Sequence, residues 1–282
     1  VRSRRQRQMC IRDRYDMKRE KQTRKLGGTV KPVIVKNVRI GEGNPKIVVP
    51  IVAPTAEDIL AEATASQTLD CDLVEWRLDY YENVADFSDV CNLSQQVMER
   101  LGQKPLLLTF RTQKEGGEMA FSEENYFALY HELVKKGALD LLDIELFANP
   151  LAADTLIHEA KKAGIKIVLC NHDFQKTPSQ EEIVARLRQM QMRQADICKI
   201  AVMPQDATDV LTLLSATNEM YTHYASVPIV TMSMGQLGMI SRVTGQLFGS
   251  ALTFGSAQQA SAPGQLSVQV LRNYLKTFEQ NK

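Results

Sequence analysis

The sequence has no run of roughly 18 consecutive apolar residues, the length that a membrane-spanning helix requires. It has no CxxC pair either, and its five cysteines show no metal-ligand spacing. Three of these cysteines lie in or beside apolar runs, which favours buried thiols in a reducing compartment over a disulfide framework. Together these absences predict a cytoplasmic protein that does not cross or bind a membrane.

Basic residues are concentrated at the start of the chain. Residues 1–26 hold eleven Lys/Arg and three Asp/Glu, so the rest of this chain of net charge +1 carries −7. A mildly acidic body does not favour nucleic-acid binding. Residues 1–16 have no apolar period, and MCIRDR (9–14) resembles the translated end of a transposase adapter. We therefore interpret residues 1–16 as a non-native, disordered head; a nucleic-acid-binding arm is the alternative.

From Pro45 onward, short apolar runs rich in β-branched residues alternate with longer amphipathic stretches. The runs are residues 46–52, 72–78, 105–111, 139–147, 166–172, 197–203, 228–234 and 251–256. Runs that are apolar on both faces are typical of parallel strands covered by helices. Eight such strands alternating with about eight helices predict an α/β fold, a (β/α)8 TIM barrel that forms a single domain over residues 17–282.

A doubly wound open sheet is the main alternative fold. No GxGxxG follows the first predicted strand, and no GxxxxGK[ST] occurs, so the nucleotide-binding versions of that fold are not indicated. Residues 30–43 have the pattern of a small β-hairpin, which we predict closes the barrel floor. Thr55 and Ser122 are predicted helix N-caps, and Ser179 with Glu182 matches a capping box.

Polar side chains gather at the carboxyl ends of the predicted strands, where barrel enzymes carry their active sites. They are Glu75, Arg77, Asp79, Arg111, Glu115, Asp143, Glu145, Asn171, His172, Asp173, Lys199, Ser233, Arg242, Ser261 and Gln265. Lys199 stands among apolar residues in its strand. Burial of a lysine lowers the pKa of its ammonium group and frees the amine as a nucleophile. The alternative is a side chain whose stem is buried while its head reaches water.

The other polar residues have both structural and functional interpretations. His172 is either an acid–base group or a hydrogen-bonded core histidine. Glu75 and Arg77 suit an ion pair inside the barrel.

Arg111 and Arg242, two arginines at the rim, suit an anionic substrate. Asp143 and Glu145 are interpreted as members of an internal network, and Cys198, adjacent to Lys199, as packing on the opposite face. The three remaining histidines lie in helical stretches without partners at i+4, so no metal site is predicted.

Six motifs, read together, resemble one enzyme family. In order they are EWRLD, TFRTQKEGGE, CNHDF, ICKIAVMP, MSMGQLGMISR and FGSAQQASAPGQ. This set is similar to type I 3-dehydroquinate dehydratases of the shikimate pathway, and the likeness covers about residues 30–280. One departure is Pro50, where many members have a serine, so a hydroxyl contact is expected to be absent or replaced there.

The resemblance implies an activity and assigns residues to it. The implied reaction is the syn elimination of water from 3-dehydroquinate to give 3-dehydroshikimate, the third step of chorismate and aromatic amino acid biosynthesis. Lys199 matches the lysine that forms a Schiff base, His172 the general acid–base group, and Glu115 the carboxylate that orients this histidine. The matching substrate-binding residues are Glu75, Arg77, Arg111, Arg242, Ser261 and Gln265. The implied enzyme is a lyase without metal or organic cofactor, and a homodimer.

The loop that holds Ser261 and Gln265 is rich in small and polar residues, and we predict that it is a lid over the substrate. Two alternative functions remain. One is a Schiff-base enzyme of the class I aldolase type, which would act on phosphorylated sugars. The other is a barrel that has kept its pocket without catalysis.

Overall fold

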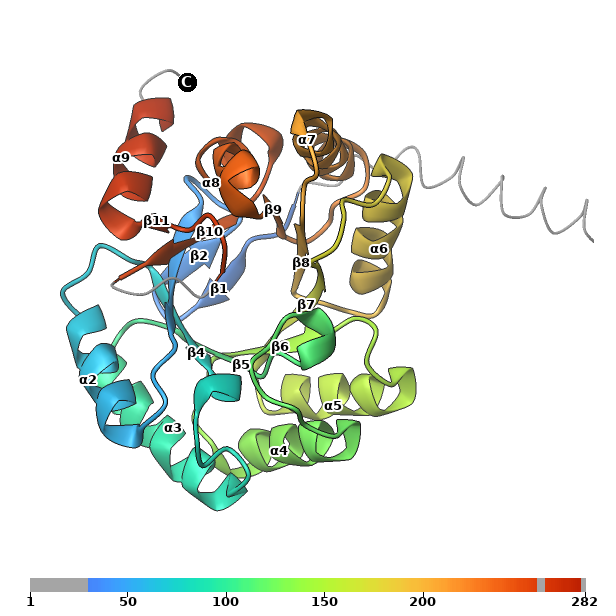
Figure 1. Cartoon of the computed structure of the whole chain (residues 1–282). Helices are drawn as coiled ribbons and strands as arrows, with labels where there is room; N and C mark the ends of the chain where they lie inside the picture. The colour runs from blue at the N-terminus through green and yellow to red at the C-terminus, as the bar shows by residue number, and fades with distance from the viewer. Residues whose placement is uncertain (1–29, 258–261, 280–282) are drawn as a thin grey trace, which may run out of the picture.

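The computed structural model describes residues 30–257 and 262–279. The predicted head at residues 1–16 lies outside these ranges. Eight parallel strands form the centre of the fold, and Figure 1 looks along their common axis. They are β3 (Lys46–Ile51), β4 (Leu73–Arg77), β5 (Leu106–Thr109), β6 (Leu141–Glu145), β7 (Lys166–Asp173), β8 (Ile197–Val202), β9 (Ile229–Ser233) and β10 (Leu252–Ser256). Each lies within a predicted run or within one residue of it.

The sheet curls until its first and last strands meet. Along it the order is β10-β3-β4-β5-β6-β7-β8-β9, with a short strand β11 (Leu266–Ser267) beside β10. Between β9 and β10 a single parallel bridge joins Ile229 to Ser250, and the amide of Ala251 donates to the carbonyl of Ile229 at 2.8 Å. The ring therefore closes as predicted, although its last seam has fewer hydrogen bonds than the others.

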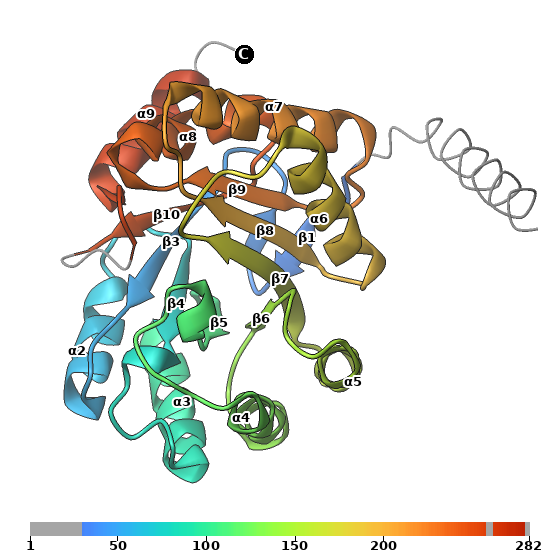
Figure 2. The ribbon, with the colours of Figure 1, turned by 45° about the vertical axis from the view of Figure 1, so that its right-hand side comes forward.

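Helices surround the strands in the order that the alternating pattern predicts (Figures 1 and 2). They are α2 (Ala56–Ser66), α3 (Phe87–Leu101), α4 (Glu123–Lys136), α5 (Pro150–Lys162), α6 (Gln180–Met192), α7 (Ala207–His223), α8 (Gly235–Phe248) and α9 (Val268–Glu279). Thr55 and Ser122 are N-caps, as predicted, because each side chain accepts a hydrogen bond from a backbone amide of the first turn. Ser179 also caps its helix, whereas the carboxylate of Glu182 is paired with Arg186.

The barrel interior is layered along its axis. Its lower layer is apolar and comes from one inward-facing residue on each strand, namely Val48, Leu73, Leu107, Leu141, Val168, Ile197, Val230 and Leu252. The hairpin β1 (Val33–Val35) and β2 (Val38–Ile40) packs against this layer, and Ile40 is fully buried there. The hairpin therefore closes the floor, as predicted.

Side chains two positions further along a strand face the same way, so they form the next layer up. In this chain that layer contains Glu75, Asp143 and Lys199, all buried. Alternation thus places charged groups directly above a sealed apolar floor.

The four cysteines of the described ranges, Cys71, Cys91, Cys170 and Cys198, are buried free thiols, as predicted. Cys198 packs in the apolar layer between strands and helices.

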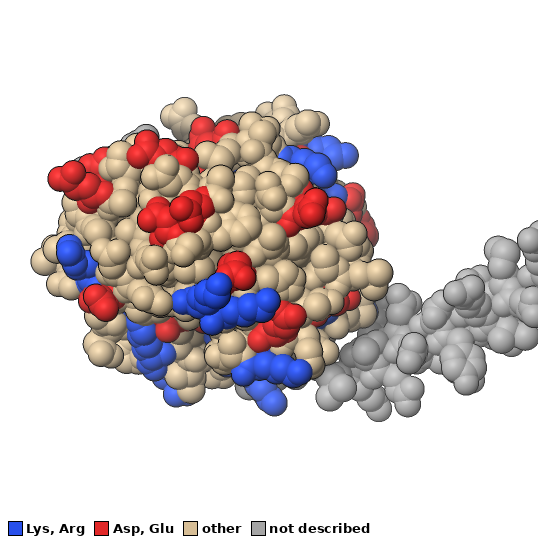
Figure 3. Space-filling view, turned by 90° about the horizontal axis from the view of Figure 1, so that it is seen from below, with Lys and Arg blue, Asp and Glu red and all other residues tan. Residues whose placement is uncertain are grey.

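Within the described ranges, no helix is both long and apolar enough to cross a bilayer. On the face shown in Figure 3, basic side chains lie among acidic ones and do not form one continuous basic patch.

Candidate active site

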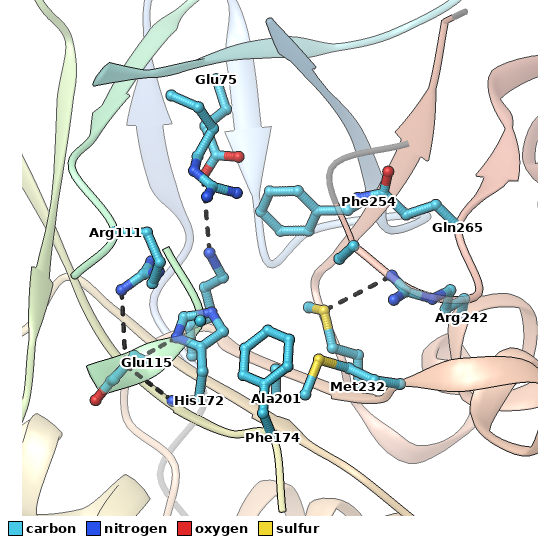
Figure 4. Close-up of a pocket in the computed structure, with 15 residues that line it drawn as sticks. Glu75, Arg111, Glu115, His172, Phe174, Ala201, Met232, Arg242, Phe254 and Gln265 are labelled. Atoms are coloured by element: carbon cyan, nitrogen blue, oxygen red, sulfur yellow. Dashed lines mark hydrogen bonds and ion pairs between the residues drawn. The ribbon is translucent and has the colours of Figure 1, made fainter. Parts of the chain in front are cut away.

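A pocket opens at the carboxyl end of the barrel strands (Figure 4). Eight of the nine residues predicted for the site line it: Glu75, Arg77, Arg111, Glu115, His172, Lys199, Arg242 and Gln265. The ninth, Ser261, lies outside the described residues, whereas residues 262–265 of the predicted lid lie within them. The structure therefore brings together, in one cavity, side chains that come from six separate parts of the sequence.

Lys199 projects from β8 into this pocket and is only 5% exposed. Its Nζ lies 3.3 Å from Oδ2 of Asp143 and 3.7 Å from Oε1 of Glu75. The ring of Phe254 lies beneath the ammonium group, with its centroid 4.5 Å away. The sequence predicted an apolar environment for this amine, and that is wrong for the head group. The apolar neighbours Cys198 and Ile200 face the opposite side of the strand, whereas the barrel interior at this level is charged.

His172 and Glu115 form a hydrogen-bonded pair at the end of β7. Nδ1 of the imidazole lies 2.9 Å from Oε2 of Glu115, and the backbone amide of His172 donates to the same oxygen at 2.9 Å. Asn171 donates its side-chain amide to the other oxygen, Oε1, at 3.1 Å. Since Nδ1 is engaged by the carboxylate, Nε2 is the nitrogen left to face a substrate.

Burial and charge set the protonation of this pair. Burial lowers the pKa of His172 well below its ordinary value, and the nearby cations Arg111, Lys199 and Arg77 lower it further. Burial, together with the like charge of Glu145, raises the pKa of Glu115 to about 8, while Arg111 opposes this shift. When Glu115 loses its proton, it accepts a hydrogen bond from Nδ1–H, which leaves the lone pair of Nε2 free to act as a base. The ionisation of Glu115 therefore controls the basicity of His172.

Arg111 is buried at the centre of a carboxylate network. Its NH2 lies 2.7 Å from Oδ1 of Asp143, and its NH1 lies 3.0 Å from Oε1 of Glu145. Burial raises the pKa of Asp143, but the cations Arg111 and Lys199 outweigh it and hold this pKa below its ordinary value. The internal network predicted for Asp143 and Glu145 is confirmed. The contact between Asp143 and Lys199 was missed, although alternation along β6 places Asp143 in the same interior layer.

Glu75 and Arg77 do not pair with each other, so that prediction is wrong. Arg77 pairs with Asp79 through two hydrogen bonds of 2.7 Å, because β4 ends at Arg77 and the following 3-10 turn η1 (Leu78–Tyr80) brings Asp79 back beside it. Glu75 instead accepts a hydrogen bond of 2.8 Å from Thr109 and faces Lys199. Arg77 thus pairs with a carboxylate, and Glu75 has both a hydrogen-bond donor and a cation beside it.

Arg242 differs from the other cations of the pocket. It projects inward from α8, and its NH2 donates to the carbonyl of Pro263 at 3.0 Å. Burial lowers its pKa to about 10. Among the described residues no carboxylate pairs with this guanidinium, and its Nε is buried without a hydrogen-bond partner. A buried guanidinium in this state is suited to an anionic ligand.

Several apolar lining residues were not singled out from the sequence, although they lie within the family-like motifs. They are Phe174, Met232, Met234, Phe254 and Ala262. At the mouth, Gly116 has φ of +84°, and a Cβ on it would lie 2.3 Å from the ring of Phe174. Only glycine permits this approach of the ring to the Glu115 loop.

Pro50, the departure from the family pattern, lies in β3 beside Glu75 and is not among the residues that line the pocket.

Ligand atoms of Glu115, Cys170 and His172 lie within 4.8 Å of one another, which is close enough for a metal ion. The groups around these three residues do not suit a metal ion. NH1 of Arg111 lies 3.0 Å from Sγ of Cys170 and 3.6 Å from Glu115, so a cation already occupies this position. Burial raises the pKa of Cys170 well above its ordinary value, which keeps the sulfur protonated, whereas metals bind the thiolate.

Comparisons with known proteins agree on one family. The sequence model of the family described as "Type I 3-dehydroquinase" matches residues 47–282. A curated 3-dehydroquinate dehydratase of Listeria welshimeri is 51% identical over 86% of this chain and 96% of its own. The structure of 3-dehydroquinate dehydratase from Enterococcus faecalis is 96% identical, with a TM-score of 0.84, and covers 88% of this chain and 100% of that one. A type I enzyme from Clostridium difficile, solved with covalently modified comenic acid, is 46% identical and has a TM-score of 0.87. The match covers 90% of this chain and 100% of that one.

Proposed function

The chain belongs to the type I 3-dehydroquinase family, and from that premise we propose that it converts 3-dehydroquinate to 3-dehydroshikimate through a Schiff base on Lys199. The observation that carries this proposal is the position of Lys199: a buried amine inside a barrel, between two carboxylates and facing a cavity. Such an amine can form a covalent imine with a ketone, and the protonated imine withdraws electrons from the neighbouring carbon. The reaction makes the chain a hydro-lyase.

Arg242 binds the carboxylate of the substrate in this proposal. It is the buried cation of the pocket that has no carboxylate partner among the described residues, so a substrate carboxylate would supply the missing charge. Gln265 lines the same side of the pocket, and Ser261 is expected to assist it. Glu75, Arg77 and Arg111 surround the region where the ring hydroxyls would lie. This arrangement directs the C3 ketone toward Lys199.

The first chemical step joins Lys199 to the substrate. Nζ attacks C3 of 3-dehydroquinate, and the carbonyl oxygen leaves as water, which produces the iminium ion. Asp143, whose pKa is held below its ordinary value, accepts a hydrogen bond from Nζ at 3.3 Å and orients the amine for attack. The ring of Phe254, 4.5 Å below, supports the positive charge that remains on this nitrogen.

His172 then moves a proton between carbon and oxygen. Its Nε2 removes the proton from C2, and the electron pair of that bond forms an enamine with the iminium carbon. The enamine expels the C1 hydroxyl, which takes the proton from His172 and leaves as water. Glu115 stabilises the imidazolium that exists between these two transfers, through its hydrogen bond to Nδ1. Water finally hydrolyses the imine and releases the product and Lys199.

We also propose a homodimer whose contact surface lies on α7 and α8. The exposed apolar side chains there are Leu211, Tyr221, Leu237, Ile240 and Leu247. The 14 residues of α8 contain one charged side chain, Arg242, and it points inward. A two-fold interface places each patch against its own copy, so an uncharged patch avoids like-charge repulsion. Tyr221 packs against Gly249, which joins the exposed faces of the two helices.

The proposed place of the reaction is the shikimate pathway, as the third step toward chorismate, in the cytoplasm. An assay of turnover tests the activity directly. The product has a carbon–carbon double bond conjugated to its carboxylate and ketone, so its formation raises the near-ultraviolet absorbance. We expect the purified protein to consume 3-dehydroquinate and not phosphorylated sugars. Turnover of a sugar phosphate, or binding of 3-dehydroquinate without an absorbance change, would contradict the proposal.

A further inference from the structure

Asn171 joins the catalytic pair to the outer layer of the barrel. It precedes His172 in β7, so its side chain starts on the opposite face of the strand, toward α6. It is 4% exposed, and its amide lies between two charged groups. Nδ2 donates to Oε1 of Glu115 at 3.1 Å, and Oδ1 accepts a hydrogen bond of 2.7 Å from NH1 of Arg186.

The two partners of this amide determine its orientation. A guanidinium has donors and no acceptor, so it can meet only the oxygen of the amide. An ionised carboxylate has acceptors and no donor, so it can meet only the nitrogen. Without the guanidinium, the amide could turn and present its oxygen to the protonated form of Glu115 instead. The side chain of Arg186 therefore decides which protonation state of Glu115 the amide supports.

Arg186 is itself held in place on α6. It pairs with Glu182 one turn earlier on the same helix, and its guanidinium lies 5.4 Å from the centroid of the Phe147 ring. Its side chain is 15% exposed. These contacts restrict the arginine before it meets Asn171, so its direction does not depend on the substrate.

We propose that Arg186 is a positioning residue for catalysis: through Asn171 it holds an amide N–H against Glu115, and so favours the ionised form of Glu115, which orients His172. This role rests on the proposed function. It assigns a part in catalysis to a helix residue that does not line the pocket.

The charged and titratable groups around Glu115 support the direction of the effect. They are Arg111 at the end of β5, Glu145 on β6, Cys170 and His172 on β7, Lys114 beside Glu115 itself, and Arg186 with Glu182 on α6. Burial and Glu145 raise the pKa of Glu115, whereas Arg111 and the hydrogen bond from Asn171 lower it. Loss of Arg186 should therefore raise this pKa further. A smaller fraction of the protein would then hold His172 as a base at neutral pH.

The test is the pH profile of kcat/KM for Arg186→Met. We expect its acidic limb to move upward by about one pH unit, which is roughly a tenfold loss at pH 7 that is recovered at high pH. Arg186→Lys keeps a charge and a donor, so it should restore most of the wild-type profile. Arg188→Met is the matched control, since Arg188 lies on the same helix over the ring of Tyr224 and should leave the limb unmoved.

A double-mutant cycle separates this hydrogen-bonded path from a long-range charge effect. In the Asn171→Leu background, Arg186→Met should move the limb no further. An equal shift in that background, an unmoved limb in Arg186→Met, or the same shift in Arg188→Met would each overturn the proposal. The titration of the His172 ring, followed by NMR in the same variants, gives the same comparison without turnover. Failure of the proposed dehydratase activity would therefore be seen separately.

Discussion

At the scale of single residues, the proposed mechanism divides one reaction between an amine and an imidazole. In the proposed mechanism Lys199 supplies the covalent bond, and its two carboxylate neighbours orient it. His172 is the proposed proton-transfer group, and its environment favours the uncharged imidazole because burial and three cations lower its pKa. The pKa of Glu115, raised to about 8, connects this environment to pH. Below this pH the pair of Glu115 and His172 holds one more proton, and Nε2 of His172 cannot act as a base. Above it that proton is lost and Nε2 is free.

The acidic limb of the pH profile should therefore depend on Glu115. In the wild type we expect kcat/KM to rise as the pH passes through about 8, because deprotonation of Glu115 frees Nε2 of His172. Glu115→Gln cannot ionise, so this limb should disappear. Its kcat should fall by about 10²-fold, because an amide stabilises the imidazolium less than a carboxylate does. Steady-state kinetics across pH measure both effects.

Glu118→Gln is the matched control for this prediction, since Glu118 is an exposed carboxylate on the same loop. It should retain the wild-type profile. A limb that persists near pH 8 in Glu115→Gln would show that another group controls the base.

At the scale of elements, the sequence predicts the strands and helices well and their side-chain partners less well. Each strand is an apolar run bounded by polar residues, and alternation then places Lys199 in the interior. The Glu75–Arg77 pair was wrong because a short turn after β4 brings back Asp79, and turns of this kind have little sequence signal. Arg186 was missed because its partner is fixed by how α6 packs on β7, which periodicity does not show. Ser261 lies outside the described residues, so its predicted role stays a prediction.

The hairpin at the barrel floor should contribute measurably to stability. Ile40 is fully buried against the lower apolar layer, so Ile40→Ala should lower the free energy of unfolding by about 2–5 kcal/mol. Ile34, on the same hairpin, is 52% exposed, and Ile34→Ala should change this free energy by only about 0.5 kcal/mol. Urea denaturation measures both. Equal effects of the two substitutions would mean that the hairpin does not seal the barrel.

At the scale of the whole molecule, the barrel has its pocket at one end and an exposed apolar patch on two adjacent helices, α7 and α8. α8 takes part in both, because its inner face carries Arg242 and its outer face carries Leu237, Ile240 and Leu247. A second copy bound to that outer face would restrict the helix that carries Arg242, the proposed binding residue for the substrate carboxylate. Dimerisation and substrate affinity are therefore expected to be linked.

Ile240→Lys should separate the dimer into monomers, because a two-fold interface would bring two added ammonium groups together. Light scattering coupled to size exclusion should give twice the chain mass for the wild type and the chain mass for the variant. Leu151→Lys on α5 is the control, since Leu151 is 81% exposed on another face. A wild-type monomer, or a dimer that survives Ile240→Lys, would contradict this interface.

The most direct measurement is chemical trapping of the imine. The protein is incubated with 3-dehydroquinate, reduced with borohydride, and analysed by intact mass and peptide mapping. We expect a ligand-sized mass gain on the peptide that contains Lys199, and neither adduct nor detectable turnover in Lys199→Ala, since loss of the nucleophile costs orders of magnitude in rate. An adduct on a different lysine, or turnover without any adduct, would contradict the central role of Lys199.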